Sequence, residues 1–204
     1  MPSLSQLYRR RADRPIAWGS ALVATIMVAL ALGAAEARAH SFQVVFLAPT
    51  SGPEATAGKA MLDGFMVATG ERDRHPDETA DGHLGGLDVY VTMVDTALDP
   101  AAVVAQVRSA RPDILAGLVT PPVAAALRGM TDAVPVGPDN GAGGTTTMDG
   151  RPFADAFRAA YGHEATPAAV IGYRQARRID TAVRAIGGEV GDRDALGAAL
   201  AGSD

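Results

Sequence analysis

Short apolar segments alternate along this chain with segments of helical periodicity, and this alternation constrains the fold more than any other sequence feature. The apolar runs at 42–48, 87–94 and 113–119 each have the length of one strand, and 134–136 is a possible fourth strand. Continuous apolar runs of this kind predict strands that are buried on both faces. Strands that alternate with helices predict one doubly wound parallel sheet, an α/β fold with helices on both faces.

Proline marks the start of the predicted helices, because the first helical position needs no amide hydrogen. Asp99 and Thr166 precede two of these prolines, and each has a side-chain oxygen that can cap a first helical turn. Gly162 and Gly187 are predicted to end helices, because glycine readily adopts the left-handed conformation that is common after the last helical turn. The prolines predicted at first helical positions are Pro53, Pro100, Pro121, Pro152 and Pro167.

The segment 140–150 is rich in glycine and threonine and has the composition of a linker. It connects the last predicted strand to the closing helices. A linker of this kind is far shorter than the roughly 50 residues that a further domain needs. The sequence therefore predicts one α/β domain over residues 40–204.

The N-terminus has the features of an export signal. A cluster of arginines precedes an apolar run from Ile16 to Ala35, and Ala37-Arg38-Ala39 fits the small-x-small cleavage pattern. Residues 1–39 are predicted to be a signal peptide, which makes the protein exported and periplasmic. The apolar run is also long enough to span a bilayer, so an uncleaved membrane anchor is the alternative.

Charge and cysteine content exclude several classes of partner. The formal net charge is −5, and the predicted leader contains more arginines than acidic residues, so the domain alone is more acidic still. Such a charge is poorly matched to nucleic acid or to anionic lipid. Cysteine is absent, so an exported domain of this kind depends on its apolar core and not on disulfides.

Ligands of open parallel sheets bind outside the carboxyl ends of the strands. Three predicted loops lie there: 49–53, 119–122 and 137–140. Helix N-termini in these loops would favour an anionic group such as a carboxylate. Ser51 and Thr120 are placed either to contact such a ligand or only to cap helices. The predicted ligand-binding residues are Ser51, Gly52, Thr120, Pro121, Asp139 and Asn140.

Several segments carry a resemblance to a known family. Residues 46–58, followed by Asp63 and Gly64, resemble the opening motif of the type I periplasmic solute-binding proteins that serve branched-chain amino acid ABC transporters. Other segments resemble later parts of that family's first lobe in order and spacing: 94–95, 99–101, 113–117, 153–157, 161–162, 167 and 172–173.

The resemblance implies a binding lobe without catalysis, and the chain departs from the family at two points. Members of the family close two lobes around the ligand, whereas the segment 140–150 stands here in place of the second lobe. Amino-acid-binding relatives commonly have a bulky aromatic residue where this chain has Ala57. The implied function is binding of a small carboxylate or amino-acid-like ligand by a single lobe.

The predicted loop 71–88 contains many acidic residues together with His75 and His83. Their spacing matches neither a calcium loop nor a helical histidine pair, and a solvated acidic loop is the competing interpretation. His40 would become the first residue after cleavage and would offer its amine and imidazole to copper. No metal site is predicted, and these three histidines are the candidates if one exists.

No catalytic motif is present. The sequence lacks a Gly-x-Ser-x-Gly elbow, a phosphate-binding loop, a paired-histidine zinc motif and a cysteine nucleophile. We therefore expect a non-enzymatic protein with no cofactor and with a small-molecule ligand. The alternatives are a periplasmic protein-interaction or scaffold module and a metal-binding protein. A lone lobe exposes surface that a second lobe would cover, so we also expect a homodimer or another periplasmic protein as partner.

Overall fold

The computed structural model of the chain describes residues 41–72, 79–118, 120–137 and 144–203. The predicted leader 1–39 lies outside these ranges, as do His40, His75, Asp139 and Asn140. Across the described ranges, no helix is both long enough and apolar enough to cross a membrane.

The described strands form a five-stranded sheet in the order β2-β3-β1-β4-β5. The central strand, β1 (Ser41–Ala48), pairs in parallel with β3 (Leu87–Asp95) and with β4 (Ile114–Gly117). At one edge β5 (Val134–Pro135) pairs in parallel with β4, and at the other β2 (His83–Leu84) pairs antiparallel with β3. The predicted α/β fold is therefore confirmed, and β2 is an addition to it.

Strand β2 was not predicted, because a two-residue strand leaves almost no periodic signal. It forms because Gly85 and Gly86 turn the chain back on itself with φ of +67° and +88°. Residues with a side chain rarely adopt such angles. The hairpin places His83 opposite Asp88 at the start of β3.

Helices α3 (Pro100–Ala110), α4 (Pro121–Leu127) and α6 (Pro167–Ala185) begin at the predicted prolines. The side chains of Asp99 and Thr166 cap α3 and α6, accepting hydrogen bonds from the amides of Ala101 and Ala169 at 2.9 and 3.2 Å. The other described helices are α2 (Ala55–Gly70), α5 (Phe153–Tyr161) and α7 (Arg193–Ala201). Pro53 and Pro152 were assigned wrongly, since both precede their helices and lie outside the first turn.

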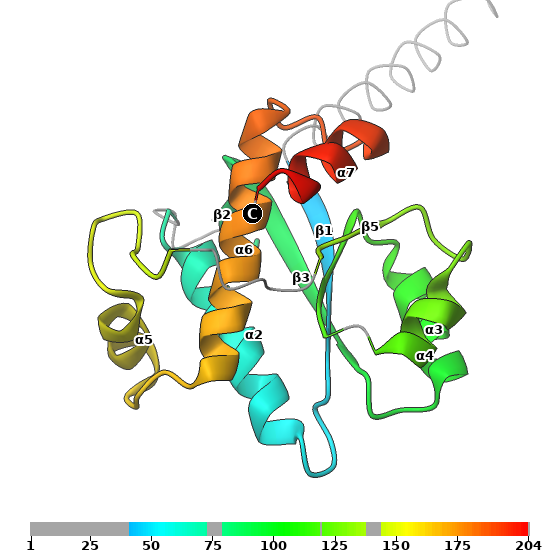
Figure 1. Cartoon of the computed structure of the whole chain (residues 1–204), viewed down its shortest axis with the longest axis horizontal. Helices are drawn as coiled ribbons and strands as arrows, with labels where there is room; N and C mark the ends of the chain where they lie inside the picture. Colours follow the sequence, from blue (N-terminus) through cyan, green and yellow to red (C-terminus); the bar gives the residue numbers. More distant parts are fainter. Residues whose placement is uncertain (1–40, 73–78, 119, 138–143, 204) are drawn as a thin grey trace, which may run out of the picture. The chain divides into compact units, whose positions relative to one another are not determined.

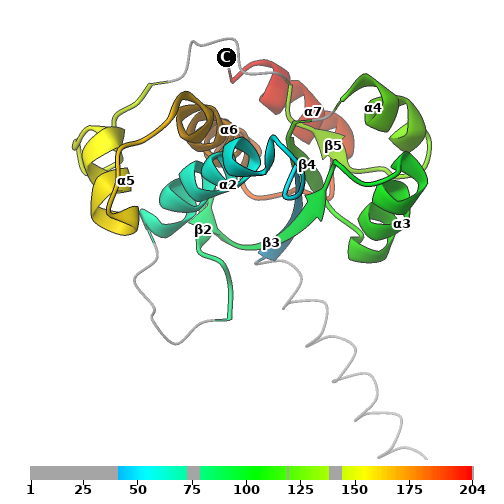
Figure 2. The same cartoon turned by 90° about the horizontal axis from the view of Figure 1, so that it is seen from below.

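The helices cover both faces of the sheet (Figures 1 and 2). Alternate side chains of β1 point to opposite faces, as the pleat of a strand requires. Phe42, Val44 and Phe46 pack with α2, α5, α6 and α7, whereas Val45 and Leu47 pack with α3 and α4. The doubly wound arrangement therefore follows from burial of β1 on both sides.

Helices α2 and α6 cross in close contact, and glycine makes this possible. A β-carbon at Gly64 would overlap the carbonyl of Ala169, and one at Gly172 would overlap the carbonyl of Met61. The two backbones thus meet directly, with no side chain between them. This contact joins the segment that follows β1 to the C-terminal part of the chain.

The described part of the predicted linker, from residue 144 onward, packs against the domain. Thr146 forms an isolated antiparallel bridge with Pro152, and the amide of Thr147 donates to the carbonyl of Arg151 at 2.8 Å. Thr147 is buried. These residues lead into α5, whose Phe153 ring stacks on Tyr173 of α6 with ring centroids 4.4 Å apart.

Candidate functional site

The carboxyl ends of β1, β3 and β4 lie at one edge of the sheet, at the bottom of Figure 1. The loop after β1 contains Ser51 and Gly52, and Gly52 has a φ of +73°. Thr120 and Pro121 follow β4, which is the neighbour of β1 in the sheet. Four of the six predicted site residues therefore come from adjacent strands, and all four are exposed.

Asp95, the last residue of β3, accepts hydrogen bonds from the loop that follows β1. One of its carboxylate oxygens accepts hydrogen bonds from the amides of Thr50 and Ala97 at 2.9 and 3.0 Å. Hydrogen bonds from the Ser51 hydroxyl, and then from the Thr50 and Ala97 amides, lower the pKa of Asp95 to about 2. The loop after β1 is thus tied to the end of β3 by an ionised carboxylate.

Sequence reasoning did not assign Asp95 to the site. The available signal was an acidic residue directly after an apolar strand, at the edge where ligands of parallel sheets bind. The partner of Ser51 could be known only once β3 was placed beside β1.

Neither predicted hydroxyl caps a helix. The residue before the first turn of α2 is Glu54, so Ser51 lies outside the capping position, and its hydroxyl binds Asp95 instead. Thr120 does precede α4, yet its side chain makes no capping hydrogen bond. Pro121 and Pro122 follow it, and because proline has no amide hydrogen, this first turn offers few donors to a cap or to an anion.

The end of β4 is fixed by a buried glutamine from α6. The Gln175 side chain accepts from the amide of Gly117 at 2.8 Å and donates to its carbonyl at 3.2 Å. Gly117 has a φ of +91°, and a β-carbon at this position would overlap the carbonyl of Leu47. Leu118, which follows β4, is 45% exposed, and Leu98, which follows β3, is 41% exposed.

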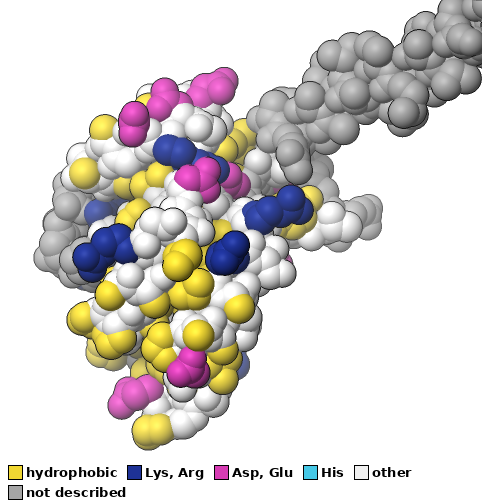
Figure 3. Space-filling view, turned by 90° about the vertical axis from the view of Figure 1, so that its right-hand side faces the viewer, with side chains coloured by type: hydrophobic (Ala, Val, Ile, Leu, Met, Phe, Trp, Pro, Cys, Tyr) yellow, Lys and Arg dark blue, Asp and Glu magenta, His cyan; other side chains and the backbone are white. Residues whose placement is uncertain are grey.

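The carboxyl edge therefore combines exposed hydroxyls and an ionised carboxylate with exposed apolar side chains. Figure 3 shows that apolar side chains also gather over the adjoining helices α3 and α4. The exposed positions of these helices are largely alanine and proline: Pro100, Ala101, Ala102, Ala105, Pro121, Pro122, Ala124 and Ala125.

The predicted acidic loop 71–88 is not uniformly solvated. The carboxylate of Glu71 is only 8% exposed and forms an ion pair with Arg177 at 2.8 Å. It also accepts hydrogen bonds from the Tyr173 hydroxyl at 2.7 Å and from the Met148 amide at 3.1 Å. Burial and the hydrogen bond to Glu71 raise the pKa of Tyr173. Glu71 is therefore a structural residue that joins α2, α6 and the segment before α5.

The histidine candidates for a metal site find no support in the described residues. His83 lies against Asp88, with its Nε2 atom 2.9 Å from a carboxylate oxygen. Within the described ranges, no three histidine, cysteine, aspartate or glutamate side chains gather closely enough to hold a metal ion.

No protein-family profile and no curated protein matches the sequence. Solved structures do match the fold. The chain is similar to an ABC transporter substrate-binding protein from Sphaerobacter thermophilus, with a TM-score of 0.57 and 14% identity. That match covers 78% of this chain and 85% of the other.

Weaker matches come from two ABC transporter solute-binding proteins of R. palustris. One, in complex with benzoate, has a TM-score of 0.48 at 14% identity and covers 79% of this chain and 85% of the other. The second, in complex with 4-hydroxybenzoate, has a TM-score of 0.36 at 21% identity and covers 47% of this chain and 26% of the other. At such low identities the similarity to the S. thermophilus protein establishes the fold alone.

Proposed function

We propose that this chain is an exported, non-catalytic solute-binding lobe that takes a small carboxylate or an amino-acid-like solute at the carboxyl edge of its sheet. The observation that carries the proposal is the shared fold with an ABC transporter substrate-binding protein, over 85% of that chain. Ligands of open α/β sheets bind at this edge.

The geometry of the edge supports a polar ligand. Ser51, Gly52, Thr120 and Pro121 lie after adjacent strands. No side chain caps the 16-residue helix α2, which begins at this edge. The positive end of the helix dipole favours an anionic group there. Asp95, whose pKa is lowered to about 2, adds a carboxylate acceptor for an amine or hydroxyl. In this proposal Asp139 and Asn140 complete the site.

The single-lobe form is part of the proposal. Support comes from the described residues, which contain a single sheet, and from the extent of the match to the S. thermophilus chain. Export rests on the signal-peptide features of residues 1–39. Export with cleavage after Ala39 would give a periplasmic protein that begins at His40. N-terminal sequencing of the protein from the periplasmic fraction tests this expectation.

Calorimetric titration of the purified protein with individual amino acids and small carboxylates tests the site. Thr120→Val removes one hydroxyl that would contact the ligand, and Ser51→Ala removes the hydroxyl that holds Asp95. Because a hydrogen bond to a charged group contributes about 1.5–3 kcal/mol, we expect Thr120→Val to weaken binding roughly ten- to hundredfold.

Thr181→Val is the matched control, since Thr181 is exposed on α6 and donates only to the carbonyl of Arg177. It should leave the affinity unchanged. If Thr120→Val and Asp139→Ala both bind the identified ligand as tightly as the unmodified protein, the site assignment is wrong. The exposed Leu98 and Leu118 would then favour the second candidate function, a protein-interaction module that uses the same edge.

A further inference from the structure

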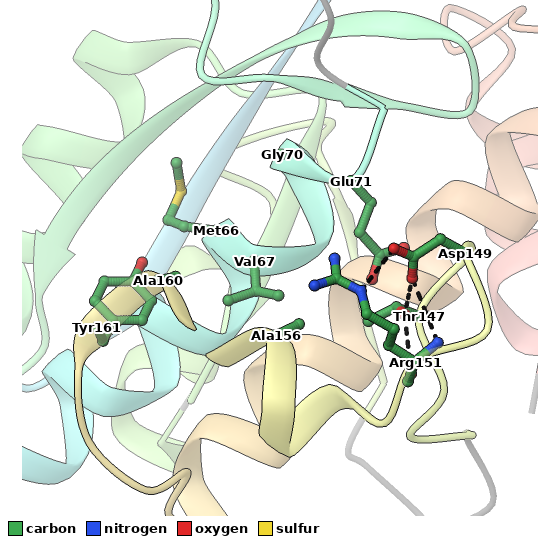
Figure 4. A pocket seen from close by; sticks show the side chains of 10 residues that line it. All are labelled: Met66, Val67, Gly70, Glu71, Thr147, Asp149, Arg151, Ala156, Ala160 and Tyr161. Carbon is green, nitrogen blue, oxygen red and sulfur yellow. Dashed lines mark hydrogen bonds and ion pairs between the residues drawn. The ribbon is translucent and has the colours of Figure 1, made fainter. Parts of the chain in front are cut away.

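A cavity of about 270 Å³ lies between α2, α5 and the residues before α5 (Figure 4). It is separate from the carboxyl edge, because Met66 lies roughly three turns along α2 from Ala55. No sequence pattern predicted it. The lining residues are Met66, Val67, Gly70, Glu71, Thr147, Asp149, Arg151, Ala156, Ala160 and Tyr161.

One side of the cavity is apolar. Met66 and Val67 of α2 line this side together with Ala156 and Tyr161 of α5, and all four residues are half-buried. Burial, followed by the charge of Asp63, raises the pKa of Tyr161. This side offers hydrocarbon contact but no charge.

The other side is charged, and both of its carboxylates already have partners. Glu71 binds Arg177 and Tyr173 as described above. Asp149 accepts from the Thr147 hydroxyl at 2.5 Å and from Nε of Arg151 at 2.7 Å. The Thr147 hydrogen bond, followed by the hydrogen bond and charge of Arg151, lowers the pKa of Asp149.

Arg151 has terminal nitrogens that can donate hydrogen bonds to a ligand. Its Nε atom and its amide contact Asp149, but within the described residues its terminal nitrogens Nη1 and Nη2 have no hydrogen-bond partner. Figure 4 shows its side chain extending past Asp149 toward Val67, so the guanidinium lies beside the apolar side of the cavity. A guanidinium pairs best with a carboxylate, through two parallel hydrogen bonds.

We propose that this cavity binds a small organic carboxylate with an apolar body, at a second site distinct from the carboxyl edge. The ligand carboxylate accepts from Nη1 and Nη2 of Arg151, and its hydrocarbon part packs against Met66, Val67 and Ala156. A volume of 270 Å³ equals that of about nine liquid waters, which is room for an acid the size of hexanoate. This proposal does not depend on the function proposed above.

Methyl NMR of the purified protein, titrated with hexanoate, tests the proposal. We expect the methyl signals of Met66 and Val67 to shift with saturation in the micromolar to millimolar range that a ligand of this size allows. The methyl signals of Val123, buried beneath α4, should stay in place. Hexanamide and hexylamine have the same hydrocarbon chain without the negative charge, and both should bind more weakly than hexanoate.

Two variants test whether hexanoate binding needs the positive charge of Arg151 and the open volume of the cavity. Arg151→Met keeps an apolar stem but removes the guanidinium, and we expect it to weaken hexanoate about tenfold or more. Ala156→Leu fills part of the cavity and should also weaken binding. Arg128→Met is the matched control, because Arg128 is an exposed arginine beyond the end of α4 and should not affect binding.

Several results would overturn the proposal: no shift of Met66 and Val67 at millimolar hexanoate, equal affinity of Arg151→Met, or tighter binding of hexylamine. Thr120→Val separates this site from the carboxyl edge. It should leave hexanoate binding at the cavity unchanged even if it abolishes solute binding at the edge. The proposal for the cavity and the proposal for the carboxyl edge can therefore be disproved separately.

Discussion

At the scale of single residues, Asp95 shows how one carboxylate positions a loop that follows another strand. It ends β3, yet it accepts hydrogen bonds from Thr50 and Ser51, which follow β1. These bonds favour the ionised form, because the neutral carboxyl group is a weaker hydrogen-bond acceptor than the carboxylate. The conformation of a predicted ligand loop thus depends on the charge of a residue 45 positions further along the chain.

Asp95 should titrate with a midpoint near pH 2, as its pKa is lowered to about 2 from an ordinary value of 3.8. A group with a lowered folded-state pKa stabilises the fold above its unfolded-state pKa and loses that contribution as pH falls. Asp95→Asn should therefore be less stable than the unmodified protein at neutral pH, with the difference shrinking between about pH 4 and 2. Carboxyl-carbon NMR measures the midpoint directly.

Ser51→Ala tests the cause of this shift. The Ser51 hydroxyl is the largest contributor, so its removal should move the Asp95 midpoint upward, toward the ordinary value. An unchanged midpoint in Ser51→Ala would show that the backbone amides alone hold the pKa down.

Glu71 should be important for stability because three donors depend on it. Glu71→Ala leaves Arg177, the Tyr173 hydroxyl and the Met148 amide without this acceptor. We expect a loss of about 2–3 kcal/mol in the free energy of unfolding, measured by denaturant titration. Glu164→Ala is the control, since its partner Arg158 is 51% exposed and such a surface pair contributes little. Similar losses in both variants would contradict the structural role of Glu71.

At the scale of elements, the crossing of α2 and α6 is a contact between backbones. Gly64 and Gly172 lie where any β-carbon would overlap a carbonyl of the facing helix. Both glycines belong to the segments by which the sequence resembles solute-binding lobes. The structure supplies the reason for the missing side chains.

Gly64→Ala and Gly172→Ala should each lower the free energy of unfolding by about 1–3 kcal/mol or more, because the helices must separate to admit a methyl group. Gly70→Ala, at the end of the same helix α2, is the control. Nothing lies within 4 Å of a β-carbon there, so this change should be neutral or stabilising. Thermal or denaturant unfolding compares the three variants, and equal stability would show that the crossing is looser than described.

At the scale of the whole molecule, we expect the protein to self-associate through the surface around the carboxyl edge. Leu98 and Leu118 are exposed there, beside the alanine-rich outer positions of α3 and α4 (Figure 3). Soluble monomers rarely leave large apolar patches uncovered, and two-fold dimers are the commonest way to cover them. Sedimentation at micromolar concentration should give about twice the mass of one chain.

The double variant Leu98→Ser, Leu118→Ser should shift this equilibrium toward the monomer. Met130→Ser is the matched control, because Met130 is 53% exposed but lies beyond the far end of α4. A monomeric unmodified protein would contradict the dimer. A dimer that survives the double variant would place the interface elsewhere.

The sequence by itself determined the order and type of the main elements except β2 and α7, which it did not predict. Apolar runs of strand length, together with Pro100, Pro121 and Pro167 and the caps Asp99 and Thr166, are local signals, and all of them are confirmed. Such signals act over a few residues, so they can be interpreted without knowing the tertiary contacts. The grouping of Ser51 with Thr120 followed from a general rule for parallel sheets, and their role in binding stays a prediction.

Tertiary structure alone decided what these residues contact. Ser51 binds Asp95, Glu71 binds an arginine 106 positions away, and the cavity beside Arg151 forms where α2 and α5 meet. Capping by Ser51 and Thr120 and solvation of Glu71 were reasonable local interpretations that the structure corrects. The physical reason is that a polar side chain takes whichever partner the fold brings within hydrogen-bond distance, and residues far apart in sequence leave no periodic pattern that identifies that partner.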